Sequence, residues 1–133
     1  MVEFGLILPI FILLLVGIFD FGRAVYAYNT INNSAREAVR LAIVNQNLGA
    51  IEATAIEHGA SLGLTAADVD VRFLQPDYTD AAPCNVTPRT GCIVEVEVRY
   101  GYTAATPIIG NIVGSLSLEG SSRQPIERTF NAP

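Results

Sequence analysis

The side chains that could perform catalysis in this chain are few and far apart. His58 is the only histidine. A serine nucleophile needs a base within hydrogen-bond distance and a third group that orients this base. No second histidine and no nucleophile motif accompanies the serines Ser61, Ser115, Ser117, Ser121 and Ser122. We therefore expect no catalytic residues and no enzymatic activity, with His58 as a hydrogen-bonded or partly exposed side chain.

The acidic side chains do not form a pattern that is typical of a metal or phosphate site. Glu95 and Glu97 alternate with valines, so they could act as paired carboxylates, but a solvated strand face explains them better. The other candidates are spread without the spacing of an EF-hand, which leaves a surface calcium site as the alternative; they are Asp68, Asp70, Asp77 and Asp80. A glycine-rich phosphate loop is also missing. We expect no metal and no cofactor.

The two cysteines, Cys84 and Cys92, lie close together around Pro88 and Gly91. Two cysteines and one histidine cannot supply the four ligands of a structural zinc site. Proline and glycine suit a tight loop, so the spacing favours a Cys84–Cys92 disulfide over free thiols. Because disulfides persist outside the cytoplasm, this part of the chain is expected there.

The N-terminal element of the chain begins with an apolar run from Phe4 to Phe19. Glu3 precedes this run and Asp20 follows it. As a helix the run is about 24 Å long, and a full membrane span needs about 20 residues. Continuing the helix makes up the length and leaves Asp20 and Arg23, three positions apart, at the membrane edge, where they can pair. A cleavable secretion signal has a basic start, so we expect this segment to be retained.

Several residues of the run could pack against other helices. Glycine permits close approach of neighbouring helices, and Pro9 removes one helical hydrogen bond, which predicts a kink or local loosening. We expect a packing core that consists of Phe4, Leu8, Pro9, Phe11, Leu15, Gly17, Phe19 and Gly22.

Beyond the most apolar part (residues 4–27), the helical pattern becomes amphipathic, and neither proline nor glycine occurs between Arg23 and Leu48. The periodicity predicts one helix from about Val2 to Asn45 or Gln46. We expect two parts: a long N-terminal helix (1–48) that serves as membrane anchor or filament core, and a small globular head (49–133).

The head is predicted to be α+β. A short helix is expected over Ala50–Leu62, and alternating patterns predict strands at 69–73, 94–100 and 115–119. Alternation means one buried and one wet face, so the three strands should form an antiparallel sheet that a helix covers on one side. Residues 75–91 form the cysteine-containing loop, Thr106–Gly110 breaks the chain before the third strand, and the tail Asn131–Pro133 is expected to be loose.

Length and charge narrow the class of protein. The 133 residues allow one small domain and an anchor. With 13 acidic and 8 basic residues, the net charge is −5. Nucleic-acid binding needs a basic face that neutralises phosphates, so we expect no nucleic-acid partner.

The N-terminal residues resemble the TadE-like pilin family of the tight-adherence pilus, whose fold is related to that of type IV pilins. The matching elements are Val2-Glu3-Phe4, the Leu-rich run with Pro9, Phe21-Gly22-Arg23-Ala24, Tyr26-Ala27-Tyr28-Asn29, and the segment from Asn33 to Arg40. The match is dense over 2–44 and diffuse afterwards. Together with the head, it implies a type IV pilin-like fold.

The resemblance also implies a life cycle. A precursor with a basic leader would lie in the inner membrane, with its head outside the cytoplasm, until a prepilin-type peptidase removes the leader. The assembly machinery would then draw the subunit into an extracellular filament of identical copies that attaches to surfaces. The sequence begins without such a leader, so we expect a processed form. Glu3 could pair with the N-terminal amine of a neighbouring subunit and fix axial register. Asp20 and Arg23 either pair within the helix or contact another subunit.

Two alternatives share much of this chemistry. The first is a minor pseudopilin that stays in the inner membrane and primes or assists pilus assembly. The second is a bitopic membrane protein whose head binds a ligand or partner, which predicts a conspicuous pocket or apolar patch in the head. The uninterrupted helix beyond the membrane edge counts against the second alternative.

Overall fold

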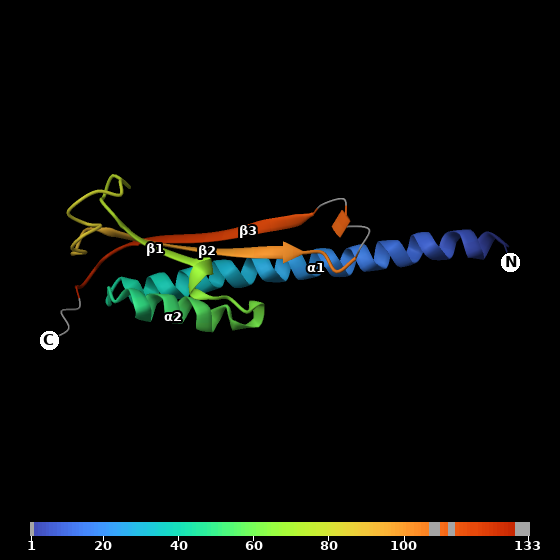
Figure 1. Ribbon diagram of the computed structural model, residues 1–133, viewed down its shortest axis with the longest axis horizontal. Coiled ribbons are helices and arrows are strands. Elements are labelled where there is room, and N and C mark those ends of the chain that lie inside the picture. The colour runs from blue at the N-terminus through green and yellow to red at the C-terminus, as the bar shows by residue number, and fades with distance from the viewer. Residues whose placement is uncertain (1, 107–109, 112–113, 130–133) are drawn as a thin grey trace.

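The elements of the protein are seen in a computed structural model, which describes residues 2–106, 110–111 and 114–129, with side chains from Phe4 onward. The chain forms helix α1 (Val2–Ala42), helix α2 (Leu48–His58), the short 3₁₀ helices η1 (Ala60–Leu62) and η2 (Ala66–Asp68), and strands β1 (Val69–Leu74), β2 (Ile93–Thr103) and β3 (Ser115–Pro125). Helix α1 runs the length of the molecule, and its N-terminal half projects beyond the other elements (Figure 1). The predicted α+β class is confirmed.

The sheet has the order β1-β2-β3, and both pairs are antiparallel, as predicted. Strand β2 lies in the centre, where Val96 pairs with Val71 of β1 and with Ser122 of β3. The two helices pack together on one side of the sheet (Figure 1). The pattern of alternating residues therefore predicted the strands and their pairing correctly.

The core joins the C-terminal half of α1 to the inner face of the sheet. Ile31 and Val39 of α1 are fully buried, as are Val96 and Val98 of β2. The fully buried helix residues Ala35, Ala38 and Ala42 have small side chains, which let the sheet and α2 approach α1 closely. Residues on both sides of position 48 thus share one core.

Helix α1 ends at Ala42, earlier than predicted, and Asn47 begins α2 instead of ending α1. The Asn47 side chain accepts a hydrogen bond from the backbone N–H of Ala50 at 3.1 Å, as an N-cap does. The backbone carbonyl of Ile43 accepts hydrogen bonds from the N–H groups of Glu127 and Arg128 at 3.2 and 3.1 Å. The chain near the C-terminus therefore takes the place of a further helical turn. The helix continues through Pro9.

The expectation that Glu95 and Glu97 lie on a solvated strand face is wrong. They are only 3% and 6% exposed. Arg72 of β1 reaches Glu97 at 2.6 Å, and Arg123 of β3 reaches Glu95 at 2.5 Å. Arg99 also pairs with Glu97. The arginine side chains lie over the carboxylates and shield them from water, which alternation within a single strand could not predict.

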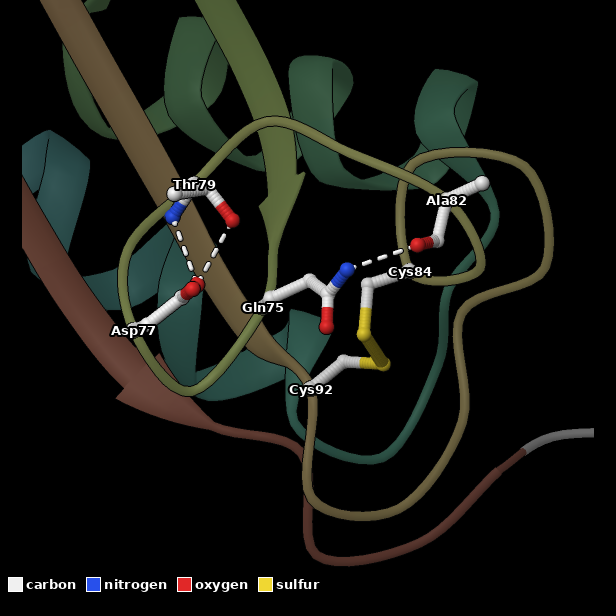
Figure 2. Close-up of a disulfide and its surroundings, with 6 residues drawn as sticks. All are labelled: Gln75, Asp77, Thr79, Ala82, Cys84 and Cys92. Carbon is white, nitrogen blue, oxygen red and sulfur yellow. Dashed lines mark hydrogen bonds between the residues drawn. A yellow bond between two sulfur atoms is a disulfide. The ribbon is translucent and has the colours of Figure 1, made fainter.

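The predicted disulfide between Cys84 and Cys92 is present, and both cysteines are buried. Figure 2 shows how the neighbouring loop is held: the Gln75 amide donates a hydrogen bond to the carbonyl of Ala82 at 2.6 Å. Closing so short a loop stabilises the fold by roughly 2–3 kcal/mol in the chain-entropy model. The central part of the predicted break, Pro107–Ile109, and the predicted loose tail, Asn131–Pro133, lie outside the described residues.

Candidate assembly helix and its junction with the head

The first part of α1 carries large apolar side chains that are mostly exposed in the part of the chain that the structure describes. Phe4, Phe11 and Phe19 are 69%, 55% and 73% exposed. Within the described residues, α1 is the one helix whose length and composition suit a membrane span, and only 6% of its most apolar window is buried. Large apolar patches on a protein surface mark contact with a membrane or a partner.

The predicted packing residues lie almost entirely on this exposed segment. Phe4, Leu8, Phe11, Leu15, Phe19 and Gly22 recur at spacings of three and four, so they share one side of the helix. Pro9 is exposed and Gly17 is half-buried. An added Cβ atom at Gly22 would meet no atom within 4 Å. Their role in packing between copies stays a prediction, as does the register role of Glu3, whose side chain lies outside the described part.

Asp20 is the buried residue at the junction between this segment and the head. It is 5% exposed. Its carboxylate accepts hydrogen bonds from the backbone N–H groups of Ala105 and Thr106, at 3.0 and 3.1 Å, and from the Thr106 hydroxyl. The Tyr102 hydroxyl donates to the Asp20 backbone carbonyl at 2.7 Å. Asp20 thus fastens the connection between β2 and β3 to the helix.

Sequence reasoning missed this contact because the partners are more than 80 residues away along the chain. The one sequence signal was the position of an acid at the end of an apolar run, where an unpaired charge is costly. The expected pair with Arg23 is present but long, at 3.8 Å from Nη1 to Oδ1. The Arg23 guanidinium also lies 5.9 Å from the centre of the Tyr102 ring. A contact of Asp20 or Arg23 with another subunit stays a prediction.

Two of the acidic candidates for metal binding have local structural partners. His58 is exposed at the end of α2. Asp68 accepts hydrogen bonds from Thr65 at the start of η2. Thr79 donates two hydrogen bonds to Asp77, and these lower the pKa of the Asp77 carboxyl (Figure 2). Across the residues that the structure describes, no group of three or more potential ligands gathers to hold a metal.

Comparison with known proteins bears on the N-terminal helix. The profile of the family described as TadE-like protein matches residues 1–40, which confirms the resemblance seen in the N-terminal motifs. The match covers nearly all of α1, including Asp20 and Arg23. No curated protein and no solved structure matches the chain. The match points to a protein associated with the tight-adherence pilus that carries a membrane-type N-terminal helix.

Proposed function

We propose, from the TadE-like match over residues 1–40, that this chain is a structural pilin-like subunit. Its helix α1 anchors it in the inner membrane and then packs with other copies in the core of an extracellular filament for surface attachment. One observation carries the proposal: the apolar half of α1 is exposed and projects from the head (Figure 1). Outside the membrane, an exposed surface of this kind costs about 25 cal/mol per Å² relative to a covered one, so an extracellular subunit requires neighbours that cover it.

The second half of α1 supports the same function. Ile31 and Val39 are fully buried in the head. The exposed segment therefore continues, as one helix, into the core of the head. A displacement of the helix therefore moves the head with it. A head that binds a soluble ligand does not need to be built on this helix, so the bitopic receptor is the weaker hypothesis. The apolar cavity lined by Leu116, where the head meets α1, is the kind of pocket that the bitopic hypothesis predicts.

The proposal includes the partners and the location that the resemblance implies. A prepilin-type peptidase and the pilus machinery would process and move the subunit, and the disulfide-containing head would lie outside the cytoplasm. In the filament, Glu3 would pair with the amine of a neighbouring subunit. The alternative, a minor pseudopilin, would use the same helix as its anchor in the inner membrane. It would contribute few or no copies to the filament.

The experiment separates packing between helices from membrane insertion. Filaments are sheared from producing cells, imaged by cryogenic electron microscopy and analysed by mass spectrometry. Gly22→Leu places a branched apolar side chain on the proposed packing face, in a position that the isolated subunit leaves open. Gly5→Leu is the matched control, because Gly5 also has open space around it and lies outside the proposed packing set.

We expect the parent chain to be the main filament subunit. Gly22→Leu should remain in the membrane fraction but yield few filaments, whereas Gly5→Leu should polymerise. Filaments that contain only traces of the chain would exclude the major subunit and favour the minor pseudopilin. Normal filaments from Gly22→Leu would exclude this packing face.

A further inference from the structure

A small polar cavity lies where α1, η1 and β2 meet. Its volume is about 160 Å³, and it is lined by Arg23, Tyr26, Ser61, Tyr100 and Tyr102, together with two apolar residues. A single water needs at least about 10–15 Å³ of such space, so the cavity can hold a group of several atoms. Figure 1 shows the turn after α2 and the end of β2 at the end of the head from which the apolar half of α1 projects.

The cavity offers hydrogen-bond donors that the described part of the chain leaves available. The Ser61 oxygen accepts a hydrogen bond from the Tyr26 hydroxyl at 2.9 Å, so the Ser61 proton is free to bind an acceptor. Tyr100 lines the cavity, and its hydroxyl has no hydrogen-bond partner among the described residues. No carboxylate side chain belongs to the lining. The arrangement favours an anionic ligand with several acceptor oxygens.

Arg23 provides the positive charge, and its neighbour Asp20 does not neutralise it closely. The Asp20 carboxylate already accepts three hydrogen bonds from Ala105 and Thr106, while Arg23 remains 3.8 Å away, beyond hydrogen-bond distance. The Arg23 side chain is 58% exposed. The Tyr102 ring, 5.9 Å from the guanidinium, helps to hold it in place. Its donors are therefore oriented and accessible.

The position of Arg23 along α1 matches the depth of lipid phosphates. At about 1.5 Å per residue, the helix rises roughly 28 Å from Phe4 to Arg23, and the hydrocarbon core of a bilayer is about 30 Å thick. With the start of the uncharged run at one boundary of the hydrocarbon, Arg23 lies close to the other boundary. Tyr26, which is 55% exposed, follows one turn later, and tyrosine is enriched at this interface.

We propose that this cavity binds the phosphate group of an anionic phospholipid in the leaflet nearest the head. Arg23 supplies the charge, and Ser61 and Tyr100 donate further hydrogen bonds. Free phosphate has the same chemistry, but the depth of the cavity favours a lipid as its source. Binding would fix the depth and rotation of α1 in the bilayer, whether or not the chain polymerises.

The test uses the full chain in a neutral detergent, with phosphatidylglycerol as the probe and native mass spectrometry to measure bound lipid. Arg23→Gln should weaken binding about tenfold or more, as expected for the loss of a charged hydrogen bond. Tyr100→Phe, which removes only a hydroxyl, should weaken it a few-fold. Arg36→Gln removes the same charge from an exposed position of the same helix and should leave binding unchanged.

Two further arms identify the source of the phosphate. Diacylglycerol with the same acyl chains should not bind, and inorganic phosphate should compete only at concentrations far above those of the lipid. Equal losses for Arg23→Gln and Arg36→Gln would overturn the proposal in favour of diffuse charge attraction. Inorganic phosphate that competes as well as the lipid would overturn the lipid assignment. Circular dichroism of each variant confirms that it is folded.

Discussion

At the scale of single residues, Asp20 shows how a charge can be kept at the end of an apolar segment. Its carboxylate is buried because two backbone N–H groups and one hydroxyl, from Ala105 and Thr106, replace water around it. Arg23 contributes only a long contact. The acid therefore joins helix and head within one subunit, and any register contact with a second subunit would come in addition.

Replacing Asp20 should weaken this junction. Asp20→Ala leaves two partly buried N–H groups without an acceptor, so we expect a loss of about 1–3 kcal/mol in the free energy of unfolding. Asp20→Asn keeps one acceptor oxygen and should lose less. Denaturant unfolding in detergent measures both variants, with the exposed Asp80→Ala as the control. Equal stability of Asp20→Ala and Asp80→Ala would show that the junction does not depend on this carboxylate.

The carboxyl groups of Glu97 and Glu119 influence each other. A hydrogen bond with Glu119, then a hydrogen bond with Arg99 and the charges of Arg99 and Arg72, lower the pKa of Glu97 below its ordinary value of 4.5. The hydrogen bond with Glu97 and its negative charge raise the pKa of Glu119 above 4.5. Glu97 therefore stabilises the fold fully above pH 4.5, and this contribution is lost as the pH falls through its lowered pKa. The contribution of Glu119 is present below pH 4.5 and is lost as the pH rises through its raised pKa.

Glu119→Gln should reveal this difference. Ionised Glu119 can no longer donate a hydrogen bond to Glu97 and repels its negative charge. Glutamine can donate at every pH and carries no charge, so the variant does not lose this stabilisation as the pH rises. The measured quantity is the free energy of unfolding of the variant minus that of the parent, from urea unfolding at pH 4 and at pH 7. We expect this difference to favour the variant more at pH 7 than at pH 4. The exposed Glu57→Gln serves as control. A pH-independent difference between Glu119→Gln and the parent would contradict the proposed coupling.

At the scale of elements, the contact between β3 and α1 depends on Gly120. An added Cβ atom at Gly120 would lie 3.0 Å from the backbone nitrogen of Asn32 and 3.1 Å from the backbone carbon of Ile31. Backbone atoms of a helix cannot move aside as a flexible side chain can. The absence of a side chain at this position therefore allows the strand to rest directly on the helix.

Gly120→Ala should separate the two elements and destabilise the protein by about 1–3 kcal/mol. Gly101→Ala is a matched control in the neighbouring strand, because an added Cβ atom there would meet nothing within 4 Å. It should be neutral or slightly stabilising. Denaturant midpoints of the two variants give the comparison. If Gly120→Ala were as stable as Gly101→Ala, the close approach of β3 to α1 would not constrain the fold.

At the scale of the whole molecule, one helix serves two environments. The described core begins at Ala27, which is 2% exposed, and extends to Ile126. The apolar residues 4–19 lie outside this core. Stability of the head and attachment to a membrane or filament therefore depend on different halves of α1.

Two truncations test this division. A chain of residues 20–133 keeps the core and the Asp20 junction, so we expect a soluble monomer that unfolds cooperatively. A chain of residues 49–133 loses Ile31 and Val39, which are fully buried, and should not fold. Size-exclusion chromatography and thermal unfolding by circular dichroism distinguish these outcomes. Aggregation of 20–133, or cooperative folding of 49–133, would contradict the division.

The sequence by itself determined the elements whose signals are local. The uncharged run from Phe4 to Phe19 predicted the exposed helix, alternation predicted three antiparallel strands, and the short spacing of Cys84 and Cys92 predicted their disulfide. Each signal lies within one segment, because periodicity, hydropathy and loop length are properties of neighbouring residues.

Only the tertiary structure decided which distant residues meet. Helix α1 ends at Ala42, where the next residue, Ile43, accepts hydrogen bonds from the chain near the C-terminus. Asp20 lies against Thr106. The tertiary structure also buries Glu95 and Glu97 beneath arginines, two of which come from neighbouring strands. A polar group at these positions can be satisfied by water or by a remote part of the chain. The packing of the whole molecule determines which of the two partners is present. Burial excludes water, so a buried polar group must bond to a remote part of the chain.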